Sequence, residues 1–173
     1  IKGEDVKKKQ RIFLTGRKIR SMDLSQLSSI GVKKIKVFKK IRVGIFSSGD
    51  ELCEFPKKKS KYEIYDANKL VLVSLFKKIG CEVNDLGIIK DNYSETKKLI
   101  LNKIKSLDVI ITSGGISKSK TDKIGKFFKN NAQIKFWRLS IKPGRPFAFG
   151  KVKNTPFIGL PGNPVAAIIT FFM

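Results

Sequence analysis

Histidine is absent from the 173 residues of the chain, and cysteine occurs only at Cys53 and Cys81. A zinc site built from cysteine and histidine, a Ser-His-Asp triad and a histidine general base are therefore excluded within these residues. Two isolated thiols are typical of ordinary core or surface positions in a reducing compartment. We accordingly expect a cytoplasmic protein.

Long apolar runs are also lacking. No stretch approaches the roughly 18 uncharged apolar residues that a membrane-spanning helix needs. The first residues, Ile1–Asp5, contain neither an initiator methionine nor the apolar core of a signal peptide, and Ile168–Met173 stops inside an apolar helix. We interpret the chain as the middle part of a longer polypeptide, and we expect no membrane-spanning helix within these residues.

Acidic residues are scarce, with 14 Asp and Glu against 37 Lys and Arg and a net charge of +23. Clustered cations can bind nucleic acid by releasing phosphate counterions. The lysines here are scattered, apart from the runs Lys7–Lys9 and Lys57–Lys61, and aromatic residues are not interleaved with them as a stacking platform would require. The pattern favours a compositional origin, so we expect a surface that attracts anions and no nucleic-acid partner.

Residues 1–40 differ from the rest of the chain. Ser21 is expected to cap a brief helix that ends at Gly31, and residues 35–38 are expected to form a strand. The helix would present one apolar face, formed by Leu24, Leu27 and Ile30. We interpret residues 1–40 as the C-terminal part of a preceding small, β-containing domain together with a linker.

From Ile41 onward, apolar segments too short for helices alternate with amphipathic ones. This alternation is typical of a parallel sheet covered by helices on both faces. Strands are expected at 42–46, 82–89 and 108–112, helices at 67–79, 96–107 and 122–130, shorter β segments at 134–138, 147–149 and 156–158, and a last helix from Pro164. The prediction is a three-layer α/β domain with a mostly parallel sheet, spanning residues 41–173.

Three glycine-bearing loops follow the expected strands, at the edge where open parallel sheets bind ligands. In the loop 47–51, the carboxylates of Asp50 and Glu51 are suitable ligands for Mg²⁺, although an ordinary strand-end turn is the alternative. In the loop 112–117, paired glycines allow backbone amides to face a phosphate or a flat heterocycle. In the loop 160–164, Asn163 suits the cap and Pro164 the first turn of a helix whose amides could bind an anion.

Two further features concern anions. Residues 141–146 fix Lys142 and Arg145 between two prolines, a pair suited to gripping a tetrahedral oxyanion unless the segment is simply a solvated turn. Asp122 stands where the next helix should begin, and a helix cap is the commonest role of such an Asp. Together, these features predict a pocket for a phosphorylated ligand and a second anion.

Seven segments resemble, in order and spacing, the molybdopterin molybdenumtransferases of the MoeA and gephyrin E-domain family. They are Ser48–Leu52, Ile64–Asn68, Asp85–Ile88, Ile111–Ser117, Phe136–Trp137, Lys142–Gly150 and Gly159–Val165. The segments Gly3–Val6 and Leu27–Gly31 resemble the close of that family's second domain. The resemblance therefore covers essentially the whole chain.

The resemblance implies a MogA-like domain within a homodimer, here without the first and C-terminal domains. It implies insertion of molybdate into adenylyl-molybdopterin, giving molybdenum cofactor and AMP, with Mg²⁺ as cofactor and possible contact with a molybdopterin adenylyltransferase. It assigns catalysis to Glu51, Asp50 and Asp122, and metal binding to Asp50 and Glu51. Substrate binding falls to Ser113, Gly114, Gly115, Ser117, Lys142, Arg145, Pro161, Gly162 and Asn163, while Asp5 matches an acidic position of the second domain.

The chain departs from the family pattern at Lys118, Lys120 and Ala166, where the family usually has a small residue, an acid and a serine. The fragment alone is therefore expected to bind ligand weakly and to be inactive. A MogA/MoaB-type adenylyltransferase, or the related domain of CinA-type proteins, is the alternative enzyme, but the segment Lys142–Pro146 and Asn163 argue against both. A non-catalytic molybdopterin-binding or scaffold role is the alternative of another class.

Overall fold

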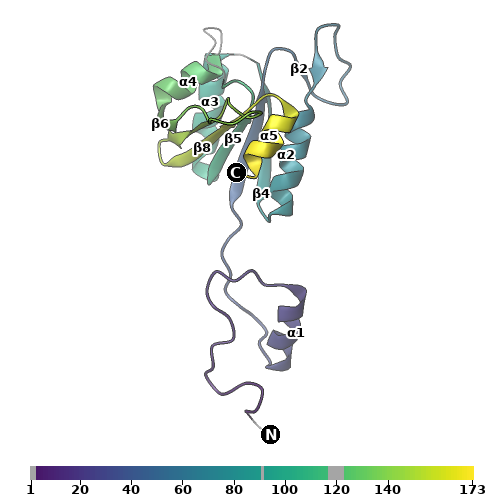
Figure 1. The fold of residues 1–173 in the computed structure, drawn as a ribbon, viewed down its shortest axis with the longest axis vertical. Coiled ribbons are helices and arrows are strands. Elements are labelled where there is room, and N and C mark those ends of the chain that lie inside the picture. Colours follow the sequence, from purple (N-terminus) through teal and green to yellow (C-terminus); the bar gives the residue numbers. More distant parts are fainter. Residues whose placement is uncertain (1–2, 91, 117–122) are drawn as a thin grey trace. The chain divides into compact units, whose positions relative to one another are not determined.

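A computed structural model describes residues 3–90, 92–116 and 123–173 (Figure 1). The chain divides into two compact units, residues 1–39 and 40–173. In the part of the chain that the structure describes, no helix is both long enough and apolar enough to cross a membrane.

In its described residues, 3–39, the amino-terminal unit contains one helix, α1 (Ser21–Ser29). The expected cap at Ser21 was wrong, because the helix begins after Arg20, whose backbone N–H donates to Asp23 Oδ2 at 2.9 Å. Of the three apolar residues expected on one face, only Leu27 is buried. The strand expected at residues 35–38 was also wrong, since the described part of this unit offers no second strand with which it could pair.

The second unit is built on a six-stranded sheet in the order β4-β1-β5-β8-β7-β6. The first four strands are parallel, β7 is antiparallel to β8, and β6 is antiparallel to β7. The strands are β1 (Arg42–Ser48), β4 (Glu82–Ile89), β5 (Val109–Ser113), β6 (Ala132–Phe136), β7 (Ala148–Val152) and β8 (Thr155–Leu160). The predicted mostly parallel α/β sheet is confirmed.

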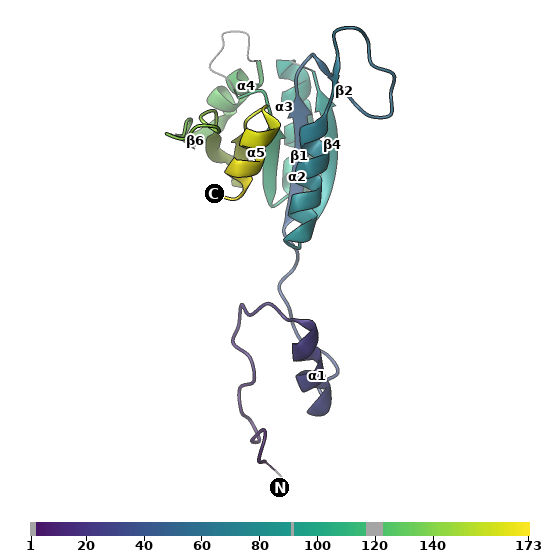
Figure 2. The same cartoon turned by 45° about the vertical axis from the view of Figure 1, so that its right-hand side comes forward.

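Helices cover both faces of this sheet (Figure 2). One layer holds α2 (Ala67–Lys78) and α5 (Pro164–Phe171), and the other holds α3 (Tyr93–Lys103), a 3-10 turn (Ile104–Ser106) and α4 (Lys123–Asn131). Each face has its own core, because side chains alternate along a strand: Ile110 packs in the α3–α4 core and Ile111 in the α2–α5 core. The architecture has three layers, as predicted.

Short polar side chains set where the helices begin. Asp66 Oδ1 accepts a hydrogen bond from the Lys69 N–H and starts α2, and Asn163 Oδ1 accepts from the Ala166 N–H and starts α5. Asn92 Oδ1 accepts from the Ser94 N–H, so α3 begins at Tyr93 rather than at Thr96 as expected. A small parallel sheet of β2 (Leu52–Cys53) and β3 (Ile64–Tyr65) lies between β1 and α2 in the chain.

Candidate functional site

A pocket of about 330 Å³ lies beyond the carboxyl ends of β1, β5 and β8. The loops that follow these strands and the segment joining β3 to α2 form its walls. Its lining residues are Ser48, Glu51, Leu52, Ile64, Tyr65, Asp66, Ala67, Asn68, Ser113, Gly114, Gly115, Ile116, Pro146, Gly162 and Pro164. This is the edge at which parallel sheets bind ligands, so the topology alone brings the three predicted loops together.

The paired glycines allow the loops after β1 and β5 to touch. Gly114 and Gly115 have φ values of +80° and +64°. A Cβ on Gly114 would lie 2.7 Å from the Ser48 carbonyl oxygen, and one on Gly115 would lie 2.6 Å from Ser48 Oγ. The Gly114 N–H donates to the Leu160 carbonyl oxygen at 3.1 Å, so this amide holds the loop against β8 instead of facing a phosphate as predicted.

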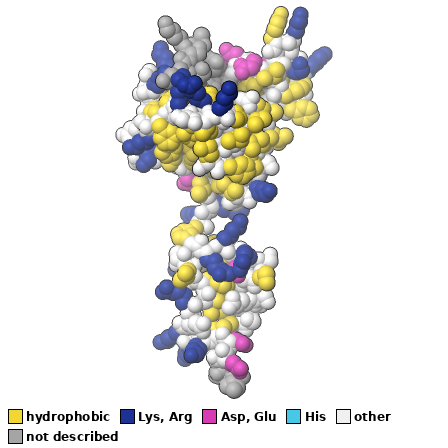
Figure 3. Space-filling model, in the orientation of Figure 1, with side chains coloured by type: hydrophobic (Ala, Val, Ile, Leu, Met, Phe, Trp, Pro, Cys, Tyr) yellow, Lys and Arg dark blue, Asp and Glu magenta, His cyan; other side chains and the backbone are white. Residues whose placement is uncertain are grey.

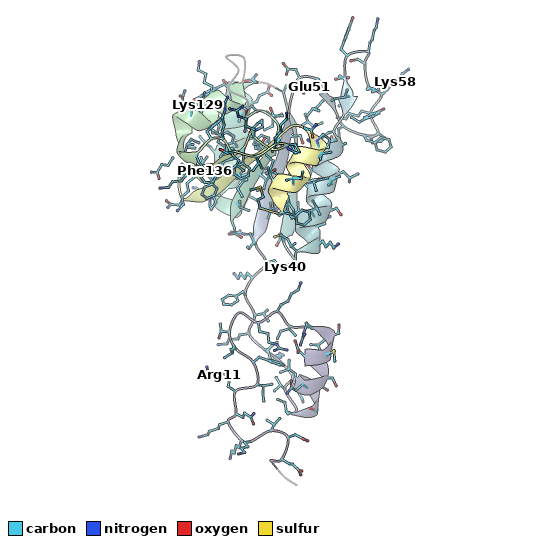
Figure 4. All side chains as sticks on the ribbon, in the orientation of Figure 1. Arg11, Lys40, Glu51, Lys58, Lys129 and Phe136 are labelled. Atoms are coloured by element: carbon cyan, nitrogen blue, oxygen red, sulfur yellow. The ribbon has the colours of Figure 1, made fainter. Side chains whose placement is uncertain are left out.

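The acidic loop brings Glu51, but not Asp50, to the pocket wall. A Cβ on Gly49 would lie 2.6 Å from Glu51 Oε1, which shows how closely the Glu51 side chain lies over the backbone. Lys90 Nζ donates to the carbonyl oxygens of Asp50 and Leu52 at 2.8 and 3.0 Å and so holds the loop in shape. Figure 4 shows Glu51 at the end of the sheet where the projecting loop with Lys58 also lies.

The donor set for the expected Mg²⁺ is small. Among the described residues, there is no group of three or more Asp, Glu, Cys or His side chains placed to hold a metal. Mg²⁺ commonly uses one or two carboxylates and completes its shell with water and substrate phosphate. Glu51 at the wall, with Asp50 next to it, therefore fits a magnesium ion that the ligand helps to hold, and does not fit a metal bound by the chain alone.

Asn68 is a pocket residue that the predicted site lacked. Its Nδ2 donates to Ser113 Oγ at 2.9 Å and to the Gly162 carbonyl oxygen at 2.7 Å. This buried side chain thus ties the loop after β5 to the loop after β8. Its segment was one of those on which the family resemblance rested, but a polar residue in the first turn of a helix gives no sign of which distant loops it contacts.

The predicted basic pair lies outside the pocket wall. The side chains of Lys142 and Arg145 are exposed, and from their segment only Pro146 lines the cavity. On the face shown in Figure 3, Lys and Arg side chains also lie around the end of the second unit that carries the pocket. The structure therefore places positive charge near the pocket without placing either side chain in it.

The other predicted residues differ in their distance from the pocket. Gly162 and Ser113 line the pocket, Pro161 is buried beside it, and Asn163 is occupied as the cap of α5. The cap uses the Ala166 N–H, and Pro164 has no N–H, so the anion site expected at the start of α5 loses two of its amides. Asp5 is exposed in the amino-terminal unit. The predictions for Ser117, Asp122, Lys118 and Lys120 concern residues outside those that the structure describes.

Ion pairs fasten the segment between β2 and β3 beside the pocket. Lys69 Nζ lies 2.7 Å from Glu54 Oε1 and 3.3 Å from Asp85 Oδ1. Burial lowers the pKa of Lys69, but the hydrogen bond that its ammonium group donates to Glu54 and the charge of Asp85 outweigh burial, so the pKa is raised overall. The pKa of Glu63 is lowered, chiefly because the Ser60 N–H donates to its carboxylate and also because Lys90 is near.

Comparison with known proteins identifies the family. A family model described as "Probable molybdopterin binding domain" matches residues 44–172. The chain belongs to the molybdopterin-binding domain family. The MoeA-type resemblance predicted from the seven segments is confirmed.

Within the molybdopterin-binding domain family, the chain is 41% identical over 170 residues to the molybdopterin molybdenumtransferase of Haemophilus influenzae. That match covers 98% of this chain and 42% of the relative, so the chain spans less than half of the length of the curated protein. A crystal structure of the MoeA protein from Pyrococcus horikoshii superposes with a TM-score of 0.86 at 28% identity, covering 97% of this chain and 42% of that one.

The fold is shared more widely than the MoeA-type sequence. The MoaB structure from Thermus thermophilus superposes with a TM-score of 0.55 at 22% identity, over 73% of this chain and 84% of that one. This likeness shows the fold alone. It confirms the predicted MogA-like fold class. The MoeA-type and MogA/MoaB-type enzymes share this fold, so the residues of the site must distinguish them.

Proposed function

We propose that this chain is the molybdopterin-binding part of a molybdopterin molybdenumtransferase. The whole protein would insert molybdate into adenylyl-molybdopterin and release AMP in a Mg²⁺-dependent reaction. The observation that carries this proposal is the meeting of Glu51 with the Ser113–Gly115 loop and Gly162 in one pocket. The greater likeness to MoeA than to MoaB structures supports the choice of reaction.

The loop after β5 would hold the phosphate of the ligand. Ser113 Oγ accepts a hydrogen bond from Asn68, which leaves its own proton to be donated to another acceptor. The glycines beside it carry no side chain that would keep a phosphate away from the backbone. A phosphorylated ligand would therefore be gripped through the Ser113 hydroxyl and the neighbouring backbone.

Glu51 would hold the metal on the opposite wall, with Asp50 as the second oxygen donor. A bound Mg²⁺ supplies charge that stabilises a phosphoryl group during cleavage. Lys142 and Arg145, near the rim, would neutralise molybdate as it approaches. Asp122, which the resemblance assigns to catalysis, and Ser117, which it assigns to substrate binding, keep these roles as part of the proposal.

Ala166 alters the oxyanion side of this arrangement. The residue is buried at the start of α5, and its methyl group supplies no hydroxyl where the family usually has a serine. Molybdate contact would therefore rest more heavily on Lys142 and Arg145. Little or no turnover by this fragment alone is part of the same proposal.

A product assay on the full-length protein tests the proposal. With adenylyl-molybdopterin, molybdate and Mg²⁺, AMP should be released together with molybdenum cofactor. Formation of adenylyl-molybdopterin from ATP and molybdopterin would instead assign the MogA/MoaB-type activity. Binding of molybdopterin without either reaction would assign a non-catalytic role.

The remaining expectations rest on the resemblance alone. We propose a homodimer, contact with a molybdopterin adenylyltransferase and a cytoplasmic location. The molar mass of the full-length protein by light scattering tests the first of these, and a monomer at micromolar concentration would contradict it.

A further inference from the structure

Two buried oxygen atoms in the pocket residues lack a hydrogen-bond partner. Among the residues that the structure describes, Asp66 Oδ2 and Asn68 Oδ1 are both buried and unpaired. Asn68 is only 9% exposed, and both residues line the pocket. Buried acceptors are nearly always paired in folded proteins because an unpaired one costs free energy. A ligand that brings N–H or O–H donors would remove that cost.

The orientation of the Asn68 amide is fixed by its neighbours. The Gly162 carbonyl oxygen can only accept, so the Asn68 atom 2.7 Å from it must be the nitrogen. Oδ1 is therefore the atom left without a partner. The two carboxylate oxygens of Asp66 also have different roles. Oδ1 caps α2 by accepting the Lys69 N–H, and Oδ2 remains unpaired.

We propose that Asp66 Oδ2 and Asn68 Oδ1 form an acceptor pair that recognises the 2-amino-4-oxopyrimidine edge of a pterin. That edge presents two neighbouring donors, the 2-amino group and the ring N3–H, so two acceptors are its complement. The corresponding edge of adenine presents a donor beside an acceptor, so one of the two oxygens would face another acceptor. The pair thus selects pterin over adenine at this wall.

This inference rests on the proposed function and adds the orientation of the ligand in the pocket. The pterin ring would lie at the β3–α2 wall, and the phosphate would lie at the Ser113–Gly115 loop. Because Asn68 also donates to Ser113 and Gly162, the residue that recognises the ring would position the loop that holds the phosphate. Pterin and phosphate binding are coupled through this one side chain.

Fluorescence titration of this chain tests the acceptor pair. The probes are 6-hydroxymethylpterin and 6-hydroxymethyllumazine, in which a carbonyl replaces the 2-amino donor, in buffer with EDTA so that no divalent metal contributes. The chain should bind the pterin at least about tenfold more tightly than the lumazine, as expected for a hydrogen bond to a carboxylate. Adenosine should not compete.

The variant Asp66→Asn isolates the proposed contact. Asparagine caps a helix as well as aspartate does, but it places an NH₂ donor where Oδ2 was. We expect about tenfold weaker pterin binding and loss of the preference over lumazine, with an unchanged thermal midpoint. Asp66→Ser, which keeps a capping oxygen and deletes the second one, should lose the same preference. The control Glu82→Gln changes a residue at the start of β4, the end opposite to the pocket. It should alter neither the pterin affinity nor the preference over lumazine.

The outcomes separate the two proposals. If the chain binds pterin and Asp66→Asn keeps the preference over lumazine, the acceptor pair is wrong and the proposed function stands. If weaker binding of Asp66→Asn is seen only when Mg²⁺ is present, Asp66 is a metal ligand and the acceptor pair is again wrong. If the unaltered chain binds neither pteridine, pterin binding by this pocket is refuted and the inference falls with it.

Discussion

The ammonium group of Lys69 lies 2.7 Å from Glu54 Oε1, although the Lys69 side chain is only 8% exposed. Asp85 approaches the same group at 3.3 Å from β4. A buried lysine with two carboxylates joins the first turn of α2 to the segment after β2 and to the sheet. These contacts stabilise the wall of the pocket that carries Asp66 and Asn68.

Replacing Lys69 by methionine should lower the free energy of unfolding by about 1–3 kcal/mol at neutral pH, since hydrogen bonds to charged groups are lost. The pKa of Lys69 is raised in the folded state, so its contribution is complete below about pH 10, the ordinary value, and is lost as the pH rises through the raised value. Urea unfolding at pH 7 and pH 11 measures this. A difference between the two proteins that does not shrink at high pH would contradict it.

Replacing Glu51 by glutamine should reduce molybdate-dependent AMP release by the full-length protein by about a hundredfold or more, because the proposed metal ligand at the pocket wall is lost. Pterin binding should be nearly unchanged, since Glu51 lies in the loop after β1 and the proposed pterin contacts come from the start of α2. Single-turnover kinetics and equilibrium binding measure the two effects. The matched control is Glu82→Gln, and normal turnover in the Glu51 variant would remove this residue from the mechanism.

Replacing Arg145 by alanine should raise the molybdate concentration needed for half-maximal AMP release by about tenfold, because the proposed charge-assisted contact with molybdate is lost. The maximal rate should change less than the requirement. Titration of molybdate against the full-length protein measures this, with Arg11→Ala as the control for loss of one surface charge. An unchanged requirement would place Arg145 outside the oxyanion site.

Acidification should weaken the amino-terminal unit through Asp23. The Arg17 guanidinium, which donates to its carboxylate at 2.7 Å, and then the Arg20 backbone N–H hold the pKa of Asp23 well below its ordinary value. A carboxylate with a lowered pKa stabilises the folded state above about pH 4, and this contribution is lost as the pH falls toward the lowered value. An NMR titration of the Arg20 amide should follow Asp23, and Asp23→Asn should abolish the response; a midpoint near pH 4 would contradict it.

The sequence predicts the sheet and its ligand edge because those features depend on local pattern. The apolar segment at residues 42–46 is too short for a helix, and Asn163 with Pro164 is a strong local signal for the start of α5. The preference for parallel strands covered by helices then predicts a mostly parallel sheet, but the order of its strands comes only from the structure. The three glycine loops could therefore be assigned to one edge without knowledge of any side-chain contact.

What could not be predicted depends on partners distant in sequence. Asn68 becomes a pocket residue only because Ser113 and Gly162, 45 and 94 residues away, fold against it. Lys142 and Arg145 stand close together in sequence, but the turn that holds them directs neither side chain to the pocket wall. The helix start at Arg20 was missed because it depends on Asp23, three residues later, whose carboxylate accepts the Arg20 N–H, while Ser21 lies inside the helix.

The position of β8 has a consequence for synthesis of the protein. The pocket needs β1, β5 and β8 side by side, and β8 joins β5 through residues 157–160, near the end of the chain. Pairing of parallel strands so far apart requires closure of long loops, which is slow. A ribosome that has released residues 1–150 therefore carries a chain that still lacks the wall of the pocket formed by the loop after β8. Ligand capture must wait until translation passes the start of α5.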